Sequence, residues 1–208
     1  MRSSRTILAF DTSAAHVAAA LLLDGQIVTR VEAMARGQGE RLMPLLEELL
    51  GHAGLSWASL DGLAVGVGPG NFTGIRISVA AVRGLALGLD IPAIGISLFE
   101  TTQLLSNRTH DTGWATAVPA PRDRFYLFAP DPDGDPMLVD SVTDSVPLSS
   151  AYTIEEHISQ MAEMVGPRGS AREIARGEGE DITSMPKPLY IKPADAAPPR
   201  DAPPVLID

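Results

Sequence analysis

The chain contains no cysteine, which excludes disulfide bridges, thiolate metal ligands and a cysteine nucleophile. Its four histidines, at positions 16, 52, 110 and 157, are far apart, and none belongs to an HExxH or HxxxH metal motif. No GxSxG segment offers a serine nucleophile. The sequence therefore predicts no metal site and no catalytic residue of its own, and a metalloprotease is excluded for want of a ligand pair.

Positive charge and long apolar runs are also scarce. The 16 basic residues are outnumbered by 26 acidic ones, giving a net charge of −10 that opposes tight binding of nucleic acid by this chain alone. No uninterrupted apolar run approaches the length needed to cross a membrane. The apolar run Ile7–Phe10 is too short for the core of a signal peptide. We expect a cytoplasmic protein that does not associate with membranes.

The segment Gly62–Asp90 predicts an apolar strand, a glycine-rich turn and a long helix, with Thr73 as the N-cap of that helix. A glycine-rich turn before a helix is typical of an anion site. However, GVGPGNFTG lacks the lysine of a P-loop and the spacing of a dinucleotide-binding fingerprint, so phosphate binding is the weaker interpretation.

The predicted helix is apolar around most of its circumference. Arg76 and Arg83 share its one polar edge. A stripe of small residues consists of Gly74, Ser78, Ala81, Gly84 and Gly88. A bulkier stripe beside it consists of Ile75, Val79, Val82, Ala86 and Leu89. Periodicity leaves two interpretations open: the whole helix packs on its own sheet, or the small stripe faces another helix, from another subunit for example.

The N-terminal strand Thr6–Phe10 ends at Asp11-Thr12-Ser13 and is followed by strands at Val17–Leu23 and Gln26–Glu32. Three such strands resemble the opening of the actin/hexokinase-like fold. In nucleotide-binding members of that fold, this first turn holds a phosphate, with the aspartate near the metal. The alternative is a strand end whose Asp and Ser satisfy the amides of the turn. We retain Asp11, Thr12 and Ser13 as candidates for proximity to a nucleotide.

A helix at Gly39–Ala53, a strand at Ile91–Ile96 and a helix at Ser97–Ser106 complete one RNase H-like module. The pattern then restarts, with strands at Ala115–Val118, Phe125–Ala129 and Met137–Val142 around the turn Asp131–Asp135, and a helix at Tyr152–Met164. The polar segment Gly169–Glu180 follows. The predicted fold is therefore α/β, a duplicated actin/hexokinase-like (ASKHA, RNase H-like) fold with a reduced second domain. The predicted limits are 1–102, 103–192 and a Pro/Ala-rich tail at 193–208.

The second half lacks the features of a second nucleotide-binding turn. Its first strand ends in Val118-Pro119-Ala120-Pro121-Arg122, where we expect no carboxylate and where two prolines remove backbone donors. No adenine-binding glycine motif follows. These absences argue against the alternative function, an autonomous actin- or sugar-kinase-like ATPase or kinase with Asp11 near its metal.

Five segments resemble the bacterial TsaB family, also called YeaZ. They are ILAFDTS (Ile7–Ser13), ERLMPLL (Glu40–Leu46), GVGPGNFTGIRI (Gly66–Ile77), GLALGL (Gly84–Leu89) and PLYIK (Pro188–Lys192). The resemblance implies a non-catalytic partner of the related enzyme TsaD in making threonylcarbamoyladenosine on tRNA beside the anticodon. It also implies that TsaE joins the complex, that TsaC supplies threonylcarbamoyl-adenylate and that tRNA is bound only through the complex.

The resemblance further implies pairing with TsaD through the two helices at Gly39–Ala53 and Thr73–Asp90. The implied interface residues are Arg41, Leu42, Leu45, Gly70, Phe72, Thr73, Gly74, Arg76, Ser78, Ala81, Gly84 and Gly88. The isolated chain is expected to carry no cofactor, since ATP or ADP and metal belong to the partner subunits or to a shared interface. Both a homodimer and a monomer stay open for the chain alone.

The sequence departs from the family pattern at two places. Gln38 stands where relatives often have a histidine, and Pro119-Ala120-Pro121 stands where they often have D-A-R.

Overall fold

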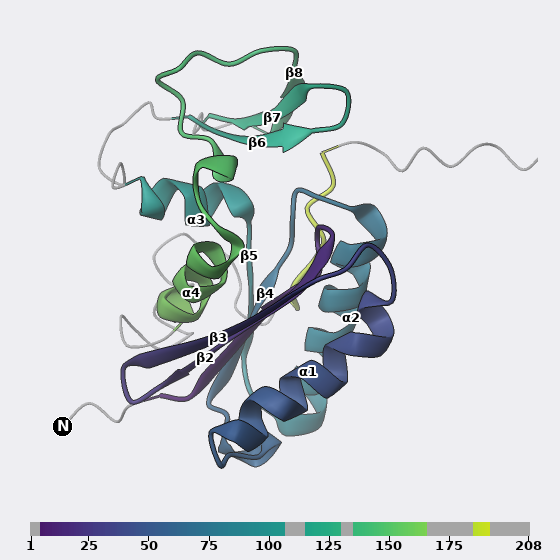
Figure 1. Ribbon diagram of the computed structural model, residues 1–208, viewed down its shortest axis with the longest axis vertical. Helices are drawn as coiled ribbons and strands as arrows, with labels where there is room; N and C mark the ends of the chain where they lie inside the picture. The colour runs from purple at the N-terminus through teal and green to yellow at the C-terminus, as the bar shows by residue number, and fades with distance from the viewer. Residues whose placement is uncertain (1–4, 107–114, 130–134, 166–184, 192–208) are drawn as a thin grey trace, which may run out of the picture.

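The computed structural model describes residues 5–106, 115–129, 135–165 and 185–191 (Figure 1). Three sequence predictions concern residues that lie wholly or largely outside these ranges: the turn at 131–135, the polar segment 169–180 and the tail at 193–208.

A five-stranded sheet forms the first half of the molecule, in the order β3-β2-β1-β4-β5. Strands β1 (Ile7–Asp11), β2 (His16–Leu23) and β3 (Gln26–Ala33) form an antiparallel meander, whereas β4 (Gly62–Gly66) and β5 (Ala93–Ile96) run parallel to β1. This is the strand order of an RNase H-like module. The sequence prediction of that module is confirmed.

Helices cover both faces of this sheet (Figure 1). Helices α1 (Gln38–His52) and α2 (Phe72–Leu89) lie on one face, and α4 (Ile154–Val165) lies on the other. The short 3-10 helix η1 (Trp57–Ser59) joins α1 to β4. Alternation along each strand assigns its side chains to the two faces. The α1/α2 face carries larger residues such as Leu8, Phe10 and Leu63.

The face beneath α4 is lined by small side chains, which leaves room for a helix close to the strands. Four of its buried residues are alanines, namely Ala9, Ala18, Ala20 and Ala64. Against them α4 places Ile158, Met161, Ala162 and Val165. A helix from the second half of the sequence thus completes the core of the first half.

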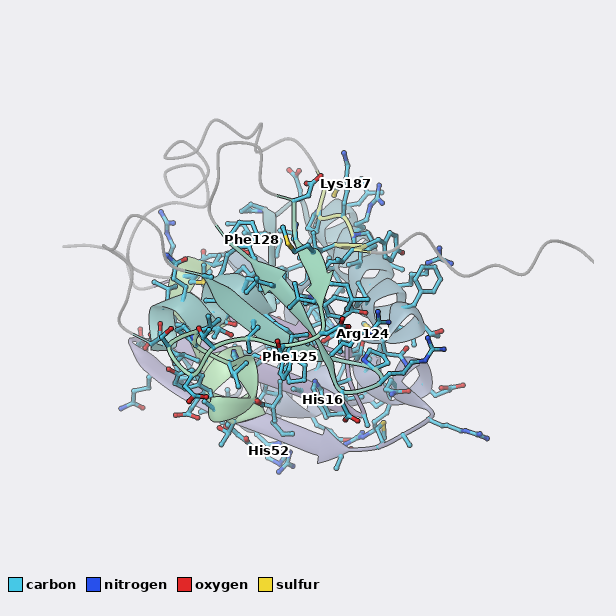
Figure 2. The ribbon with its side chains drawn as sticks, turned by 90° about the horizontal axis from the view of Figure 1, so that it is seen from above. His16, His52, Arg124, Phe125, Phe128 and Lys187 are labelled. Atoms are coloured by element: carbon cyan, nitrogen blue, oxygen red, sulfur yellow. The ribbon has the colours of Figure 1, made fainter. Side chains whose placement is uncertain are left out.

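The second sheet is a small antiparallel meander of β6 (Thr116–Ala120), β7 (Arg124–Phe128) and β8 (Met137–Val139). It is seen from above in Figure 2, where Phe125 and Phe128 of β7 are labelled. Phe128 packs on Phe99 of α3 (Leu98–Leu105), with ring centroids 5.5 Å apart. Since α3 spans residues 98–105, the predicted domain boundary at 102/103 falls inside this helix. The second 3-10 helix, η2 (Ser149–Ala151), leads into α4.

The residues 185–191, which we call the return segment, lie beside the β4–α2 connection (yellow in Figure 1; Lys187 is labelled in Figure 2). The backbone N–H of Leu189 donates a 2.8 Å hydrogen bond to the carbonyl of Val67. Leu189 packs against the α1/α2 core, and Pro186 is buried next to Gly95. The described part of the PLYIK motif, Pro188–Ile191, thus belongs to the segment that packs on the first half.

His157 of α4 is buried where α3, α4 and η2 meet. Its Nε2 lies 3.0 Å from the carbonyl oxygen of Ser149, which can only accept, so Nε2 carries the proton of the neutral ring. Nδ1 then accepts from the hydroxyl of Thr101, 2.7 Å away. Burial lowers the pKa of His157 below its usual 6.5, because the charged ring would lose its hydration.

This shift predicts a pH dependence of folding stability. Because the folded state holds the neutral ring, its stabilisation is complete above the unfolded pKa near 6.5 and is lost as the pH falls below that value. We expect the melting temperature to fall between pH 7.5 and pH 5.5, and to fall less in His157→Gln. His52, which is exposed, provides the control His52→Gln with the wild-type dependence. Identical pH profiles for wild type and His157→Gln would contradict this assignment.

Candidate functional site

The candidate nucleotide turn begins with Asp11 at the end of β1, and its hydrogen bonds are satisfied internally. One carboxylate oxygen, Oδ1, accepts from the backbone N–H and the hydroxyl of Ser13, both at 2.8 Å. It also lies 2.9 Å from Nε2 of His16. Asp11 is only 4% exposed. The amide of Ser13, which a phosphate would need, already has an acceptor, so this geometry favours the satisfied strand end over a phosphate-binding turn.

His16 was not predicted as a member of this cluster. It opens β2, where the antiparallel pairing of β1 and β2 places it beside the end of β1. The cluster does not form a Ser-His-Asp relay, because Ser13 and His16 both bond the same oxygen of Asp11. In such a relay the imidazole stands between the hydroxyl and the carboxylate.

The glycine-rich turn packs directly on this cluster. A Cβ at Gly66 would overlap the carboxylate of Asp11, and a Cβ at Gly70 would overlap the carbonyl oxygen of Ser13. The N–H of Asn71 donates to that same carbonyl, at 2.5 Å. The glycines are therefore explained by close packing of two backbone turns against each other.

The structure corrects the predicted start of α2. The N-cap is Asn71, whose side chain accepts from the N–H of Gly74 at 3.0 Å, and Thr73 lies inside the first turn. The hydroxyl of Thr12 donates to the carbonyl of Gly74 at 2.6 Å, which fixes the helix start on the β1 turn.

Two glycines of α2 should respond in opposite ways to alanine. A Cβ at Gly74 would overlap the carbonyl of Thr12, whereas a Cβ at Gly84 meets nothing within 4 Å. We expect Gly84→Ala to stabilise the isolated chain by up to about 1 kcal/mol through helix propensity. Gly74→Ala should destabilise it by about 1–3 kcal/mol through overpacking. Urea unfolding of both variants measures the difference, and equal changes would contradict the packing described here.

Four of the predicted interface residues are buried, which corrects their assignment. Leu42 and Leu45 of α1 belong to the core, at 1% and 0% exposed. Ser78 is 0% exposed, and its hydroxyl lies 3.1 Å from the carbonyl of Ile75 and 3.4 Å from that of Gly66. Gly74 is buried against Thr12. A partner cannot reach these positions on the folded chain.

Arg41 of the predicted interface is used within the chain. Its Nε and Nη2 donate to the carboxylate of Glu32, at 2.7 and 2.6 Å, and Nη1 and Nη2 donate to that of Glu48, at 2.7 and 2.8 Å. These hydrogen bonds raise the pKa of Arg41 and lower those of Glu32 and Glu48. Arg41 therefore links α1 to β3 through Glu32, and it also pairs with Glu48 on its own helix.

One side of α2 is open to solvent, and most of the remaining predicted interface residues of that helix lie on it. We define the outer face of α2 by its exposed residues, Thr73, Arg76, Ala80, Arg83, Gly84, Leu87 and Gly88. Leu87 is 77% exposed. Ala81 lies at the edge of this face, and Phe72 is half-buried at its start. Val79 and Val82, from the bulkier stripe, lie in the core.

The starts of α1 and α2 border an open cavity of about 650 Å³, whose lining includes Arg36, Gln38, Asn71 and Thr73. The amide of Gln38 donates to the carbonyls of Ala14 and Met34, both at 3.3 Å. The residue at this departure from the family pattern thus ties the start of α1 to the β1–β2 and β3–α1 connections.

The turn of the second half also differs from prediction. Pro119 and Ala120 extend β6, and the hairpin turn falls on residues 121–123, with Arg122 and Asp123 at positive φ. A carboxylate, that of Asp123, therefore does lie in this turn. The sequence prediction failed here because prolines at a strand end were interpreted as the turn itself.

Among the described residues, no three His, Asp or Glu side chains come together in a way that could hold a metal ion. In the same part of the chain, α2 is the one helix long and apolar enough to cross a membrane. Its residues Ile75, Val79, Val82 and Ala86 are buried against the sheet, as in the core helix of a globular domain.

Comparisons with known proteins agree with this architecture. The family model of TsaD, tRNA N6-adenosine threonylcarbamoyltransferase, matches residues 31–128. The tRNA threonylcarbamoyladenosine biosynthesis protein TsaB of Escherichia coli is 39% identical over 95 residues, which cover 46% of this chain and 41% of that protein. TsaB of Haemophilus influenzae is 41% identical over 92 residues, covering 44% and 39%. The alignments thus span about two fifths of these relatives.

The fold extends beyond those alignments. The solved structure of YeaZ from Pseudomonas aeruginosa superposes with a TM-score of 0.63 at 24% identity, covering 89% of this chain and 99% of that one. The two sheets and their helices therefore define an actin/hexokinase-like protein with a reduced second half. Its N-terminal sequence is similar to that of TsaB proteins, and its fold is similar to that of YeaZ.

Proposed function

We propose that this chain is a non-catalytic partner subunit of a TsaD-type threonylcarbamoyltransferase, required for the threonylcarbamoyladenosine modification of tRNA next to the anticodon. The observation that carries the proposal is the outer face of α2. Gly84 and Gly88 stand there with nothing within 4 Å of their Cβ positions, and Leu87 is 77% exposed. Interior glycines cost a helix about 1 kcal/mol each. Close approach of a partner helix would offset that cost.

The internally bonded turn at Asp11 supports the absence of catalysis by this chain alone. All three donors around Oδ1 come from the protein itself. One observation favours the alternative, an autonomous ATPase or kinase: Asp123 lies in the turn of the second half, where a second acid would be needed. We weigh the satisfied turn more heavily, because Ser13 has no free amide for a phosphate.

We further propose TsaD and TsaE as the partners of this chain, in the cytoplasm. The names of its relatives, which refer to threonylcarbamoyladenosine biosynthesis, support a place in that process. We infer that ATP or ADP and metal bind to those partners or at a shared interface. With a net charge of −10, this chain should contact tRNA only within the complex. A homodimer through the same face of α2 is proposed for the isolated chain.

Mixing the chain with its cognate TsaD and measuring mass by light scattering tests the proposal. We expect a heterodimer, with no ATP hydrolysis by this chain alone and no sub-micromolar tRNA binding at physiological salt. ATP turnover that disappears in Asp11→Ala would establish the ATPase instead. Separate elution of the two proteins under all conditions would contradict the partnership.

A further inference from the structure

Arg76 is held in one orientation by two aromatic residues. Its guanidinium carbon lies 3.7 Å from the ring centroid of Phe72 and 5.7 Å from that of Tyr190. Its Nε donates a 2.9 Å hydrogen bond to the hydroxyl of Tyr190. The two rings contact each other, with centroids 4.9 Å apart. Cation–π contacts of this kind act within about 6 Å of a ring centroid.

The return segment fixes the position of Tyr190. The neighbouring Leu189 is tied to Val67 by a backbone hydrogen bond and packs against the α1/α2 core. Tyr190 therefore contacts α2 although it lies 114 residues after Arg76 in the sequence. This anchoring lets a residue remote in sequence determine where the Arg76 side chain points.

The terminal nitrogens of Arg76 remain available. No described residue accepts a hydrogen bond from Nη1 or Nη2, and Arg76 is exposed. An arginine whose Nε and one face of whose guanidinium are already engaged presents these two nitrogens as a fixed fork. That fork matches a carboxylate or a phosphate with two parallel hydrogen bonds, and little side-chain freedom remains to be lost on binding.

The surroundings of Arg76 favour a carboxylate on a protein. Arg83 lies seven residues further along the same face and forms no ion pair within the described residues, although the chain carries 26 acidic residues. After Arg83 the outer face of α2 is apolar, with the exposed Leu87 and the glycines Gly84 and Gly88. A nucleic-acid surface would need more cations than these two.

We propose that Arg76 is a preset receptor for a carboxylate of the partner subunit, with Tyr190 and Phe72 as positioning residues. The partner surface that meets α2 accordingly carries an Asp or Glu opposite Arg76. This inference rests on the proposed function and specifies the chemistry of the partner at that same surface.

The test measures the Kd of the cognate TsaD for four variants at 0.1 and 0.5 M NaCl. Arg76→Gln should weaken binding about 10- to 100-fold at low salt. Arg76→Lys, which keeps the charge and loses the fork, should weaken it about 10-fold. Tyr190→Phe keeps the ring and loses the hydroxyl, and we expect it to weaken binding of TsaD about 3- to 10-fold. Arg30→Gln is the matched control, since Arg30 is an exposed arginine on β3, and its Kd should not change.

A double variant separates positioning from direct contact. If Tyr190 acts through Arg76, Tyr190→Phe should add no further loss in the Arg76→Gln background. The loss in Arg76→Gln should also shrink at 0.5 M NaCl, where charge pairs are screened. Melting temperatures close to wild type for all variants are part of the expected result, because the effect is on binding.

Four outcomes would overturn the inference. Wild-type affinity in Arg76→Gln, with binding lost in Gly84→Arg, would remove the receptor and leave the proposed function standing. Unchanged TsaD affinity with weaker tRNA binding by the assembled complex would show that the fork takes a phosphate. Equal losses from Tyr190→Phe in both backgrounds would show that Tyr190 contacts the partner itself. No binding by wild type would remove the proposed function, and this inference with it.

Discussion

Replacing Gly84 by arginine is expected to leave the isolated chain folded and to abolish its pairing with a TsaD-type partner. Gly84 is exposed on α2, and no heavy atom lies within 4 Å of its Cβ position, so the new side chain enters solvent in the monomer. Packed helix axes are about 8–10 Å apart, and a long side chain at the contact line forces them further apart. We expect the Kd for TsaD to rise at least about 100-fold.

Gly51→Arg is the matched control for that variant. Gly51 is likewise an exposed glycine in a helix, α1, with open space at its Cβ position. Both variants should keep a cooperative melt at or above the wild-type temperature, because arginine is the better helix former. Isothermal titration calorimetry with TsaD then separates them. Wild-type affinity in Gly84→Arg would place the interface elsewhere on the surface.

The second large effect is expected at Ser78, six residues earlier in the same helix. Ser78 is 0% exposed and lies against the carbonyl of Gly66. Ser78→Arg would place an unpaired charge in the core, a change that costs about 3–5 kcal/mol in comparable buried sites. Against a total stability of about 5–15 kcal/mol, the variant should lose its cooperative melt or precipitate.

Two further variants calibrate this result. Ser78→Ala removes only the hydroxyl and should cost about 1 kcal/mol. Val82→Arg, at another 0% exposed position of α2, should unfold the chain as Ser78→Arg does. Circular dichroism during thermal unfolding measures all three. A folded Ser78→Arg that merely fails to bind TsaD would return Ser78 to the interface.

The contrast between Gly84 and Ser78 shows what the periodicity of a helix can predict and what it cannot. The spacing of Gly74, Ser78, Gly84 and Gly88 correctly indicated that they share one stripe of α2. It could not indicate which part of the stripe is covered. The β1 turn covers Gly74, and the end of β4 lies against Ser78, whereas nothing covers Gly84 and Gly88. That difference is set by a contact distant in sequence.

The strands were easier to predict than the site. Buried strands such as β1 and β4 read as apolar runs ending in glycine or aspartate, and their order followed from the hairpin and the crossovers. The bonds of His16 to Asp11 and of Tyr190 to Arg76 have no such local signal. Each joins residues through the packing of separate elements, and a histidine or tyrosine alone gives no sign of it.

The placement of α4 has a consequence for the order in which the protein is made. The sheet emerges from the ribosome before Ile154–Val165, so its alanine-lined face stays uncovered while the small second sheet is still being synthesised. During that interval the nascent chain exposes an apolar surface bordered by the open edge of β3, a feature that promotes aggregation. A protein shortened after α3 would stay permanently in that condition, whatever the strength of its own strands.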